Sequence, residues 1–355
     1  MTCGTADYRF YTTCSYIPCS IRQSNPSSIP FPIPLFHKSP KPHCTCSPIY
    51  YNYADELKKR GYFNRVKQQI VQMYEEGNKV TLVAHSMGAP TTLYFLNTEN
   101  GIVTQEWKDQ YIHAYVTLSG AWAGSPRAVE EIVSGNNFGL PGMIYDKFFR
   151  DVSRSLESVV WLFPYSKIFG NESTIVSTPS KNYTAKNFTT LFKDIDHPNG
   201  SYMYEGVKKI NEEIPDPKVR THCYWGLGTP TPSSYHYDKE FPVDVGYDAK
   251  TYNSNGDGYV NEIASKACLL WPNTTTVEHK TFEGVDHFHM VKNNAIFEAV
   301  ANVVKNVPAK GTVHQNPMYD KRKGGMIHDT GYHGFTKYNA IRRMIRKMVQ
   351  MMVRI

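Results

Sequence analysis

The stretch KVTLVAHSMGAPTTLYFL, residues 79–96, sets the apolar pattern of a short buried strand directly against the pattern of a helix. The five residues Ala-His-Ser-Met-Gly join the two patterns, with small residues on either side of the His-Ser-Met centre at Ser86. Such a turn can hold a serine clear of the end of a strand, where a substrate could reach it. The alternative is a tight strand-to-helix connection that contains a serine by chance.

Regular patterns extend on both sides of this stretch. A helix pattern over residues 54–77 precedes it, and a second buried-type strand pattern follows at residues 113–120. A strand, helix, strand order predicts a parallel sheet and therefore an α/β fold. Further strand patterns lie at residues 220–227 and 276–285, and a last helix pattern lies at NNAIFEAVANVVKNV.

Composition divides the chain into five parts. Residues 122–220 lose the regular rhythm and contain four of the five Asn-x-Ser/Thr sequons, which predicts a glycosylated cap inserted into the core. The predicted parts are a Pro-, Ser- and Cys-rich segment at 1–52, the first part of the core at 53–121, the cap at 122–220, the second part of the core at 221–308 and a basic tail at 309–355.

Overall composition and charge exclude several classes of protein. The chain has 355 residues, of which 41% are hydrophobic and 13% aromatic, as expected for a globular protein and not for a disordered one. Nine of its 39 Lys and Arg residues fall in 321–355. The remainder carries 30 basic and 31 acidic residues, so its charge gives no reason to expect nucleic acid as a partner.

The sequons and the amino terminus give conflicting evidence about entry into the secretory route. The sequons fit a protein on the secretory route, and they lie at Asn171, Asn182, Asn187, Asn199 and Asn273. The first twenty residues have neither the basic start nor the continuous apolar run of a signal peptide. We therefore expect that the natural start is missing from this sequence.

Seven cysteines give a mixed signal. Five lie in the first 46 residues, and only Cys223 and Cys268 belong to the body of the chain. An oxidising compartment would permit a disulfide between these two, and two buried free thiols are the equal alternative. Cys44 and Cys46 lie near two histidines, but a single C-x-C pair is weak evidence for zinc, and no metal site is predicted.

Candidates for a catalytic acid and base follow the serine along the chain. In NSNGDGYVN, Asp257 lies between two glycines that let the chain bend and leave the carboxylate free, and an ordinary Gly-rich turn is the alternative. A calcium-binding loop is excluded because Ala264 occupies the position where that loop needs glutamate. In GVDHFHM, His287 and His289 cannot both face the serine if the segment is extended.

The chain order Ser86, Asp257, His287 is that of the nucleophile, acid and base of α/β-hydrolases. We therefore predict an α/β-hydrolase with a parallel sheet and an inserted cap. The backbone N–H of Met87, the residue after the serine, is the predicted oxyanion donor.

Several segments taken together resemble the lecithin–cholesterol acyltransferase family, and most closely its lysosomal phospholipase A branch. The similar segments span about residues 53–307 in order, and they are AHSMGAPTTLYFL, LSGAWAGSP, HCYWGLGTPTPSSYHYD, NGDGYVN with the following Cys268 and Trp271, and DHFHM. The resemblance implies that Ser86 is the nucleophile, Asp257 the acid and His287 the base.

The same resemblance implies further features. It implies a disulfide between Cys223 and Cys268, a glycan on Asn182, and a lid at 122–145 whose apolar side chains shelter a fatty chain. The implied reaction passes an acyl chain from a phospholipid to the serine and then to water or a lipophilic alcohol, without a cofactor. The implied partner is a phospholipid membrane or a lipoprotein surface, and the implied location is the lysosome or outside the cell.

The chain also departs from the family. The family's first strand, whose loop supplies a second oxyanion donor, is not recognisable in residues 1–50, so we expect weak activity from the chain as written. This departure supports the alternative of a catalytically impaired lipid-binding or structural glycoprotein; a serine carboxypeptidase-like enzyme or a lipase of the same fold is a third hypothesis. The tail KYNAIRRMIRKMVQMMVRI predicts a basic amphipathic helix on an anionic membrane, or else an unstructured extension.

Overall fold

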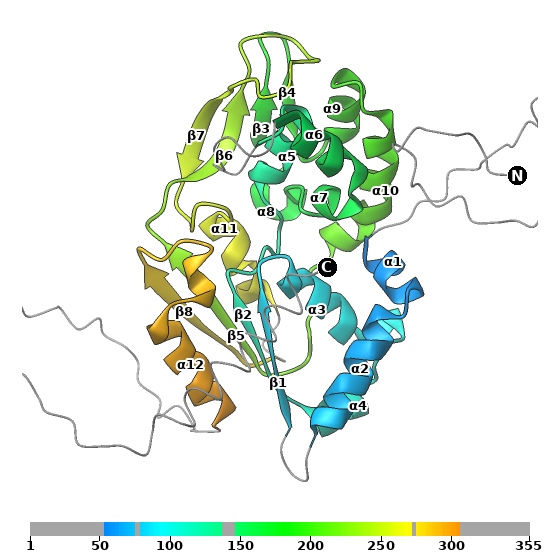
Figure 1. The fold of residues 1–355 in the computed structure, drawn as a ribbon, viewed down its shortest axis with the longest axis vertical. Coiled ribbons are helices and arrows are strands. Elements are labelled where there is room, and N and C mark those ends of the chain that lie inside the picture. The colour runs from blue at the N-terminus through cyan, green and yellow to red at the C-terminus, as the bar shows by residue number, and fades with distance from the viewer. Residues whose placement is uncertain (1–52, 75–78, 137–145, 272–274, 306–355) are drawn as a thin grey trace, which may run out of the picture. The chain divides into compact units, whose positions relative to one another are not determined.

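The computed structural model describes residues 53–74, 79–136, 146–271 and 275–305 (Figure 1). The amino-terminal segment, the basic tail, the sequon at Asn273 and the 137–145 part of the expected lid lie outside these residues. The expectations for them stay predictions. Within the described ranges, no helix is both long and apolar enough to cross a bilayer.

The core is a parallel sheet with the strand order β1-β2-β5-β8. Its strands are β1 Val80–His85, β2 Ile112–Leu118, β5 Thr221–Leu227 and β8 Val277–Glu283. The parallel α/β sheet expected from the strand, helix, strand order is therefore present. The strands β1, β2 and β5 are buried along most of their length, as is typical of a parallel sheet that is covered on both faces.

Helices cover both faces of this sheet. They are α1 Tyr53–Lys59, α2 Tyr62–Met73, α3 Gly88–Leu96, α4 Gln105–Tyr111 and α12 Asn294–Val304, with a short 3₁₀ helix η1 Thr98–Asn100. Successive side chains of β1 point to opposite faces. Leu82 belongs to the hydrophobic cluster that contains Phe95 of α3, whereas Val83 belongs to the cluster that contains Ile296 of α12.

The helix expected over residues 54–77 is divided into α1 and α2. Gly61 separates them with φ 72°, in the left-handed region that glycine adopts without strain. Phe63 and Ile70 of α2 are buried, whereas Met73 at its end is exposed.

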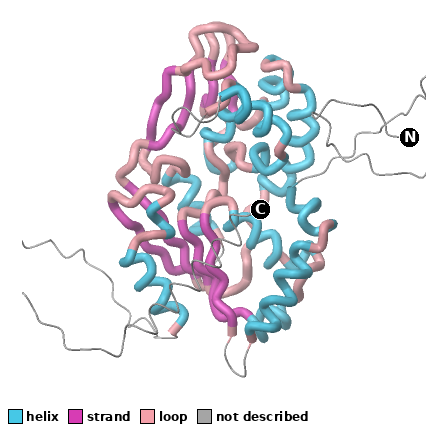
Figure 2. The backbone as a smooth tube through the Cα atoms, viewed as in Figure 1, coloured by secondary structure: helices cyan, strands magenta, loops and turns pink. Residues whose placement is uncertain are grey.

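A second, mixed sheet forms a separate group of strands beyond the core sheet (Figure 2). Its order is β4-β3-β6-β7, with strands β3 Thr174–Ser177, β4 Asn182–Thr184, β6 Thr231–His236 and β7 Lys250–Ser254. Helices lie beside it at the upper end of Figure 1. They are α5 Pro126–Val133, α6 Asp146–Ser155, α7 Glu157–Trp161, α8 Ser166–Phe169, α9 Phe188–Asp194 and α10 Pro198–Glu212.

This second sheet draws on residues from both sides of position 220, where the sequence pattern set the boundary between cap and core. β3 and β4 come from the predicted cap, whereas β6 and β7 come from the predicted second part of the core. The chain therefore leaves the core sheet after β5, contributes to the second sheet, and returns to the core at β8.

A disulfide anchors the segment that follows the second sheet. The elements of this segment are α11 Glu262–Ser265 and the 3₁₀ helix η2 Lys266–Leu270. Cys268 of η2 is bonded to Cys223 of β5, with their Cα atoms 6.8 Å apart, which is the pairing that the family resemblance implies. Trp271 packs edge-to-face on Trp122, with ring centroids 5.1 Å apart. The segment is thus tied both to the core sheet and to the start of the cap.

Candidate active site

Ser86 lies on a strained turn at the end of β1. It has φ 55°, which a residue other than glycine adopts at a cost in energy. Its N–H donates a hydrogen bond to the carbonyl of Leu118 on β2, 3.1 Å away, and its carbonyl accepts one from Ala89 in the first turn of α3. The strand, turn and helix are those expected from the sequence, and the turn lifts the serine above the carboxyl end of the sheet.

Asp257 is held in the loop between β7 and α11. Its side chain is fully buried, and its Oδ1 accepts hydrogen bonds from the N–H groups of Tyr259 at 3.0 Å and Val260 at 2.8 Å. The flanking glycines allow this tight loop. Gly258 has φ 91°, and a Cβ on Gly256 would lie 2.5 Å from the carbonyl oxygen of Val260.

His287 joins the other two residues. Its Nδ1 lies 2.8 Å from Oδ2 of Asp257, and its Nε2 lies 2.8 Å from Oγ of Ser86. Its backbone N–H also donates to the carbonyl of Asp257 at 2.8 Å. The structure therefore brings together the three side chains that the chain order singled out, at the carboxyl end of the core sheet.

His289, the competing base, faces away from this cluster. Its side chain is 64% exposed, and its Nδ1 pairs with the carboxylate of Asp286. Only one of the two histidines contacts Ser86, and that histidine is His287. The segment is not extended, because Phe288 has helical φ and ψ and the 3₁₀ helix η3 His289–Val291 follows it.

The carboxyl group of Asp257 is ionised at neutral and mildly acidic pH. Burial raises its pKa, but the hydrogen bond and the charge of His287, together with hydrogen bonds from Ser119 and the Val260 N–H, outweigh burial and leave the pKa below its ordinary value. An anion at this position accepts a hydrogen bond from Nδ1–H of His287 and so fixes Nδ1 as the proton-bearing atom of the neutral ring.

His85 is a further member of the site that sequence reasoning missed. Its Nε2 lies 2.9 Å from the carbonyl oxygen of His287, and the two rings are 4.6 Å apart between centroids. Burial, and then the charge of His287, lower the pKa of His85 to about 3, so the ring is neutral and its Nε2–H donates to that carbonyl. The signal available in the sequence was its place directly before Ser86.

Met87 occupies the position expected of an oxyanion donor. It is the residue that caps α3, with helical φ and ψ of −59° and −23°. Its carbonyl is used by Thr91, whose N–H and hydroxyl both donate to it. Among the described residues, the Met87 N–H donates to no backbone carbonyl outside the helices and strands. Its role as oxyanion donor stays a prediction.

The described part of the expected lid, residues 122–136, packs against the core. Trp122 is buried in edge-to-face contact with Tyr115 of β2 and with Trp271. Ser125 caps α5, and its Oγ also donates to the carbonyl of Tyr259 in the loop that carries Asp257. The start of the cap is therefore bonded directly to the loop of the candidate acid.

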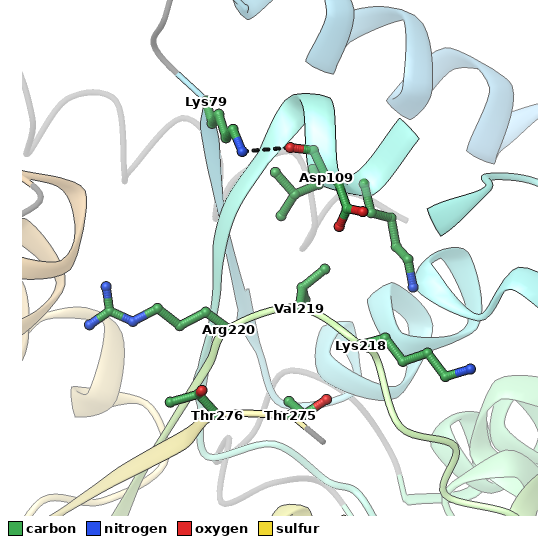
Figure 3. A pocket seen from close by; sticks show the side chains of 9 residues that line it. Lys79, Asp109, Lys218, Val219, Arg220, Thr275 and Thr276 are labelled. Carbon is green, nitrogen blue, oxygen red and sulfur yellow. Dashed lines mark hydrogen bonds between the residues drawn. The ribbon is translucent and has the colours of Figure 1, made fainter. Parts of the chain in front are cut away.

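A cavity of about 410 Å³ lies at the other end of the core sheet (Figure 3). Its walls come from the segments that run into the amino ends of β1, β2, β5 and β8, and are made by Lys79, Lys108, Asp109, Ile112, Lys218, Val219, Arg220, Thr275 and Thr276. Lys79 donates to the carbonyl of Asp109, while Lys218 and Arg220 point away from each other. This cavity does not include Ser86, which follows the carboxyl end of its strand, and we assign it no part in the chemistry.

Within the described residues, no cluster of His, Cys, Asp and Glu side chains has an arrangement that could hold a metal ion.

The strand order, the helix layers and the turn that carries Ser86 place the chain among the α/β-hydrolases. Comparison with known proteins refines this class. The model of the lecithin:cholesterol acyltransferase family matches residues 51–294, and the chain belongs to that family.

Two relatives illustrate the similarity. Phosphatidylcholine-sterol acyltransferase of Gallus gallus is 36% identical over 236 residues, which cover 66% of this chain and 55% of that protein. Lysosomal phospholipase A and acyltransferase of Mus musculus is 35% identical over 237 residues, which cover 65% of this chain and 55% of that protein. The chain thus spans about half the length of the curated relatives it matches. The solved structure of the Tle4-Tli4 complex aligns over 72% of this chain and 66% of its own chain, with 13% identity and a TM-score of 0.47, too low to support an argument.

Proposed function

We propose that this chain is a serine-dependent phospholipase A and O-acyltransferase in which Ser86, His287 and Asp257 form the catalytic triad. The observation that carries the proposal is the position of the His287 imidazole, with one nitrogen 2.8 Å from Ser86 Oγ and the other 2.8 Å from Asp257 Oδ2. The family membership adds the substrate class, because the relatives named above are a sterol acyltransferase that uses phosphatidylcholine and a phospholipase A with acyltransferase activity.

In the first half of the reaction, Ser86 Oγ attacks the carbonyl carbon of a phospholipid acyl ester. The hydroxyl proton moves to Nε2 of His287 as the new C–O bond forms. When the tetrahedral intermediate breaks down, the bond to the glycerol oxygen is cleaved and that oxygen takes the proton from Nε2. The products are a lysophospholipid and an acyl chain esterified to Ser86.

In the second half, water or an alcohol attacks the acyl-enzyme. His287 Nε2 accepts the proton of the attacking oxygen and returns it to Ser86 Oγ when the serine leaves. Water gives a free fatty acid, and a lipophilic alcohol gives a new ester. The choice of acceptor decides whether the chain acts as a hydrolase or as an acyltransferase.

The surroundings of the triad support these steps. Asp257 holds the imidazole in the tautomer that has its proton on Nδ1 and stabilises the imidazolium formed during attack. The pKa of Asp257 lies below its ordinary value, which keeps this carboxylate charged at the acidic pH of a lysosome as well as at neutral pH. The Met87 N–H, at the positive end of the α3 dipole, is the proposed donor to the oxyanion.

The proposal extends to location and partners. A phospholipid membrane or a lipoprotein surface would present the substrate, and the lysosome or the outside of the cell would be the site of action, by analogy with the relatives' names. A lipid-binding glycoprotein without catalysis is the competing proposal. The preformed contacts of His287 favour catalysis, because binding alone needs no hydrogen-bonded serine, histidine and carboxylate.

A fluorophosphonate serine probe tests the proposal. The full chain, expressed through the secretory route, should become labelled at Ser86, and labelling should block release of fatty acid from phosphatidylcholine vesicles. Ser86→Ala should abolish both. Triglyceride and peptide substrates tested in parallel separate a general lipase or a peptidase from a phospholipase. A folded parent chain that takes up no probe would support the lipid-binding alternative.

A further inference from the structure

Tyr259 contacts both Asp257 and His287, the candidate acid and base. Its N–H donates to Asp257 Oδ1 at 3.0 Å. Its ring stacks on the imidazole of His287, with centroids 5.3 Å apart and an angle of 26° between the ring planes. The residue follows the Gly-Asp-Gly segment directly, so one short loop supplies the acid and an aromatic face for the base.

The start of α5 holds Tyr259 from the cap side. The guanidinium carbon of Arg127 lies 4.6 Å from the centroid of the Tyr259 ring, and Ser125 Oγ donates to the Tyr259 carbonyl. Among the described residues, the Nε of Arg127 is buried and makes no hydrogen bond. The ring of Tyr259 is one contact of this guanidinium, and a cation over a tyrosine face is an attractive arrangement. The charge of Arg127 also acts on Glu130 in the same helix, where it opposes the rise in pKa that burial causes.

The two side-chain hydrogen bonds of His287 do not fix the plane of its imidazole tightly, because the angle at a hydrogen bond can vary. The contacts to Asp257 and Ser86 act on opposite sides of the ring, at Nδ1 and Nε2. Rotation of the ring about its Cβ–Cγ bond bends both hydrogen bonds and turns the Nε2 lone pair out of line with the serine hydroxyl. A ring stacked on the imidazole opposes this motion, because tilting separates the two faces.

We propose that Tyr259 is a positioning residue that fixes the plane of the His287 imidazole, and that Arg127 holds Tyr259 in that position. In this arrangement the orientation of the base depends on the cap, through the first turn of α5. The inference rests on the proposed function, since an oriented imidazole matters only if His287 is the base. It adds to the triad a residue that acts through His287.

Three variants separate the ring from the other properties of Tyr259. Tyr259→Phe keeps the ring and removes the hydroxyl, and should retain kcat within about twofold. Tyr259→Thr removes the ring and keeps the backbone contacts to Asp257, and should lower kcat roughly tenfold with KM changed less than about twofold, since small errors in orientation are costly in the transition state. Arg127→Met removes the cation at similar length, and should lower kcat by a smaller factor in the same direction.

A matched pair elsewhere in the chain serves as the control. Lys250 lies over the ring of Tyr252 on β7, 5.2 Å from its centroid, and no imidazole of the described residues is stacked on that ring. Tyr252→Thr therefore removes a tyrosine with a cation on its face but no recorded contact with His287, and should leave kcat unchanged. Thermal unfolding of every variant shows whether a loss of kcat reflects loss of the folded state.

A second readout does not depend on turnover. The Nδ1 proton of His287, shared with Asp257, gives a proton NMR signal at very low field, and its position and exchange rate report the geometry of that hydrogen bond. In Tyr259→Thr this signal should shift or exchange faster, and in Tyr259→Phe it should stay as in the parent. The signal is assigned by its loss in His287→Ala.

The outcomes distinguish this inference from the proposed function. If the parent chain takes no fluorophosphonate label, the proposed function fails, and the NMR comparison still decides whether Tyr259 orients the imidazole. If the parent is labelled and Tyr259→Thr retains both its kcat and its low-field signal, Tyr259 is not a positioning residue. Equal losses in Tyr259→Phe and Tyr259→Thr would also overturn the inference, because they would assign the effect to the hydroxyl.

Discussion

His287 Nε2 lies 2.8 Å from Ser86 Oγ, although the two residues are 201 positions apart in the chain. They follow β1 and β8, which form the two ends of the strand order β1-β2-β5-β8. The contact therefore spans the whole described core sheet. The fold of the sheet, and not nearness in the chain, therefore brings the candidate nucleophile to its base.

The first prediction concerns the unit that these residues form. Ser86→Ala, His287→Ala and Asp257→Asn should each lower kcat by about 10⁴-fold or more, because each removes a member of the same proton-transfer arrangement. For the same reason, the double variants should be no worse than the worse single variant. Initial rates on phosphatidylcholine vesicles, together with probe labelling, measure the effect.

His289→Ala is the matched control for this experiment. His289 is the neighbouring histidine, it is 64% exposed, and its partner is Asp286. The variant should retain activity within about twofold. An inactive His289→Ala beside an active His287→Ala would transfer the role of base to His289.

The second prediction concerns the disulfide between Cys223 and Cys268. It closes a segment of 45 residues, for which the chain-entropy model gives at most about 4 kcal/mol of stabilisation. Replacing both cysteines by alanine should lower the free energy of unfolding by roughly 2–4 kcal/mol, measured by urea denaturation. Because the bridge ties β5 to the segment after Asp257, the midpoint of thermal inactivation should fall as well.

Mass mapping of an unreduced digest provides the direct check of that bridge. A linked pair of peptides containing Cys223 and Cys268 is expected, and it should separate on reduction. Two free thiols at these positions in the folded, secreted chain would contradict the prediction, whatever the stability of the double variant.

The third prediction ranks the sequons by the state of their side chains. Asn171 and Asn182 are exposed and should carry glycans in a chain made through the secretory route. The Asn187 amide is used within a turn, since its Oδ1 accepts from the Thr184 N–H at 2.7 Å and its Nδ2 donates to the Asn182 carbonyl at 3.2 Å. A glycan there would disturb this turn, so occupancy at Asn187 should be the lowest of the three.

Glycopeptide mass spectrometry with enzymatic deglycosylation measures the three occupancies. Asn182→Gln gives the comparison, because it removes a sequon but keeps the backbone carbonyl that Asn187 uses. Full occupancy at Asn187 in the folded, secreted chain would mean that its hydrogen bonds do not restrict modification.

The core sheet and the candidate triad could be predicted because both are visible in the sequence, one as local patterns and the other as an order of residues. Strand patterns mark the buried strands, and the fold requires the chain order serine, acid, histidine. The choice between His287 and His289 could not be made from chain order alone, and the family resemblance made it. It depends on the turn after β8, where the His287 N–H binds the Asp257 carbonyl from a distant loop.

The second sheet and the neighbours of the base were missed for a related reason. β3 and β4 have only four and three residues, and β3 pairs with β6 across more than 50 positions, so neither leaves a periodic signal. His85 and Tyr259 both stood in quoted motifs, but their importance arises from ring contacts with His287 that form only on folding. Local patterns carry no information about such long-range contacts.

The last prediction concerns the dependence of stability on pH, through the buried His222 of β5. Its side chain is 2% exposed, and neither ring nitrogen makes a hydrogen bond among the described residues. Burial lowers the pKa of His222 to about 4, while Glu278 at 3.6 Å acts in the opposite direction and Arg220 and His113 add to the lowering.

In the unfolded chain the pKa of histidine is near its ordinary value of about 6.5. Below this value the unfolded state binds a proton that the folded state does not, so the contribution to stability is intact above about pH 6.5 and is lost as the pH falls toward 4. For a shift of this size, the free energy of unfolding should drop by roughly 2–3 kcal/mol between pH 7 and pH 4.5 from this residue alone.

His222→Phe fills a similar volume with a ring that cannot take up a proton, and should reduce that drop by the same amount. Urea denaturation of the parent and the variant at both pH values measures it, with His289→Ala, an exposed histidine, as the variant that should leave the drop unchanged. An equal drop in the parent and in His222→Phe would show that the buried imidazole does not set the acid sensitivity of the fold.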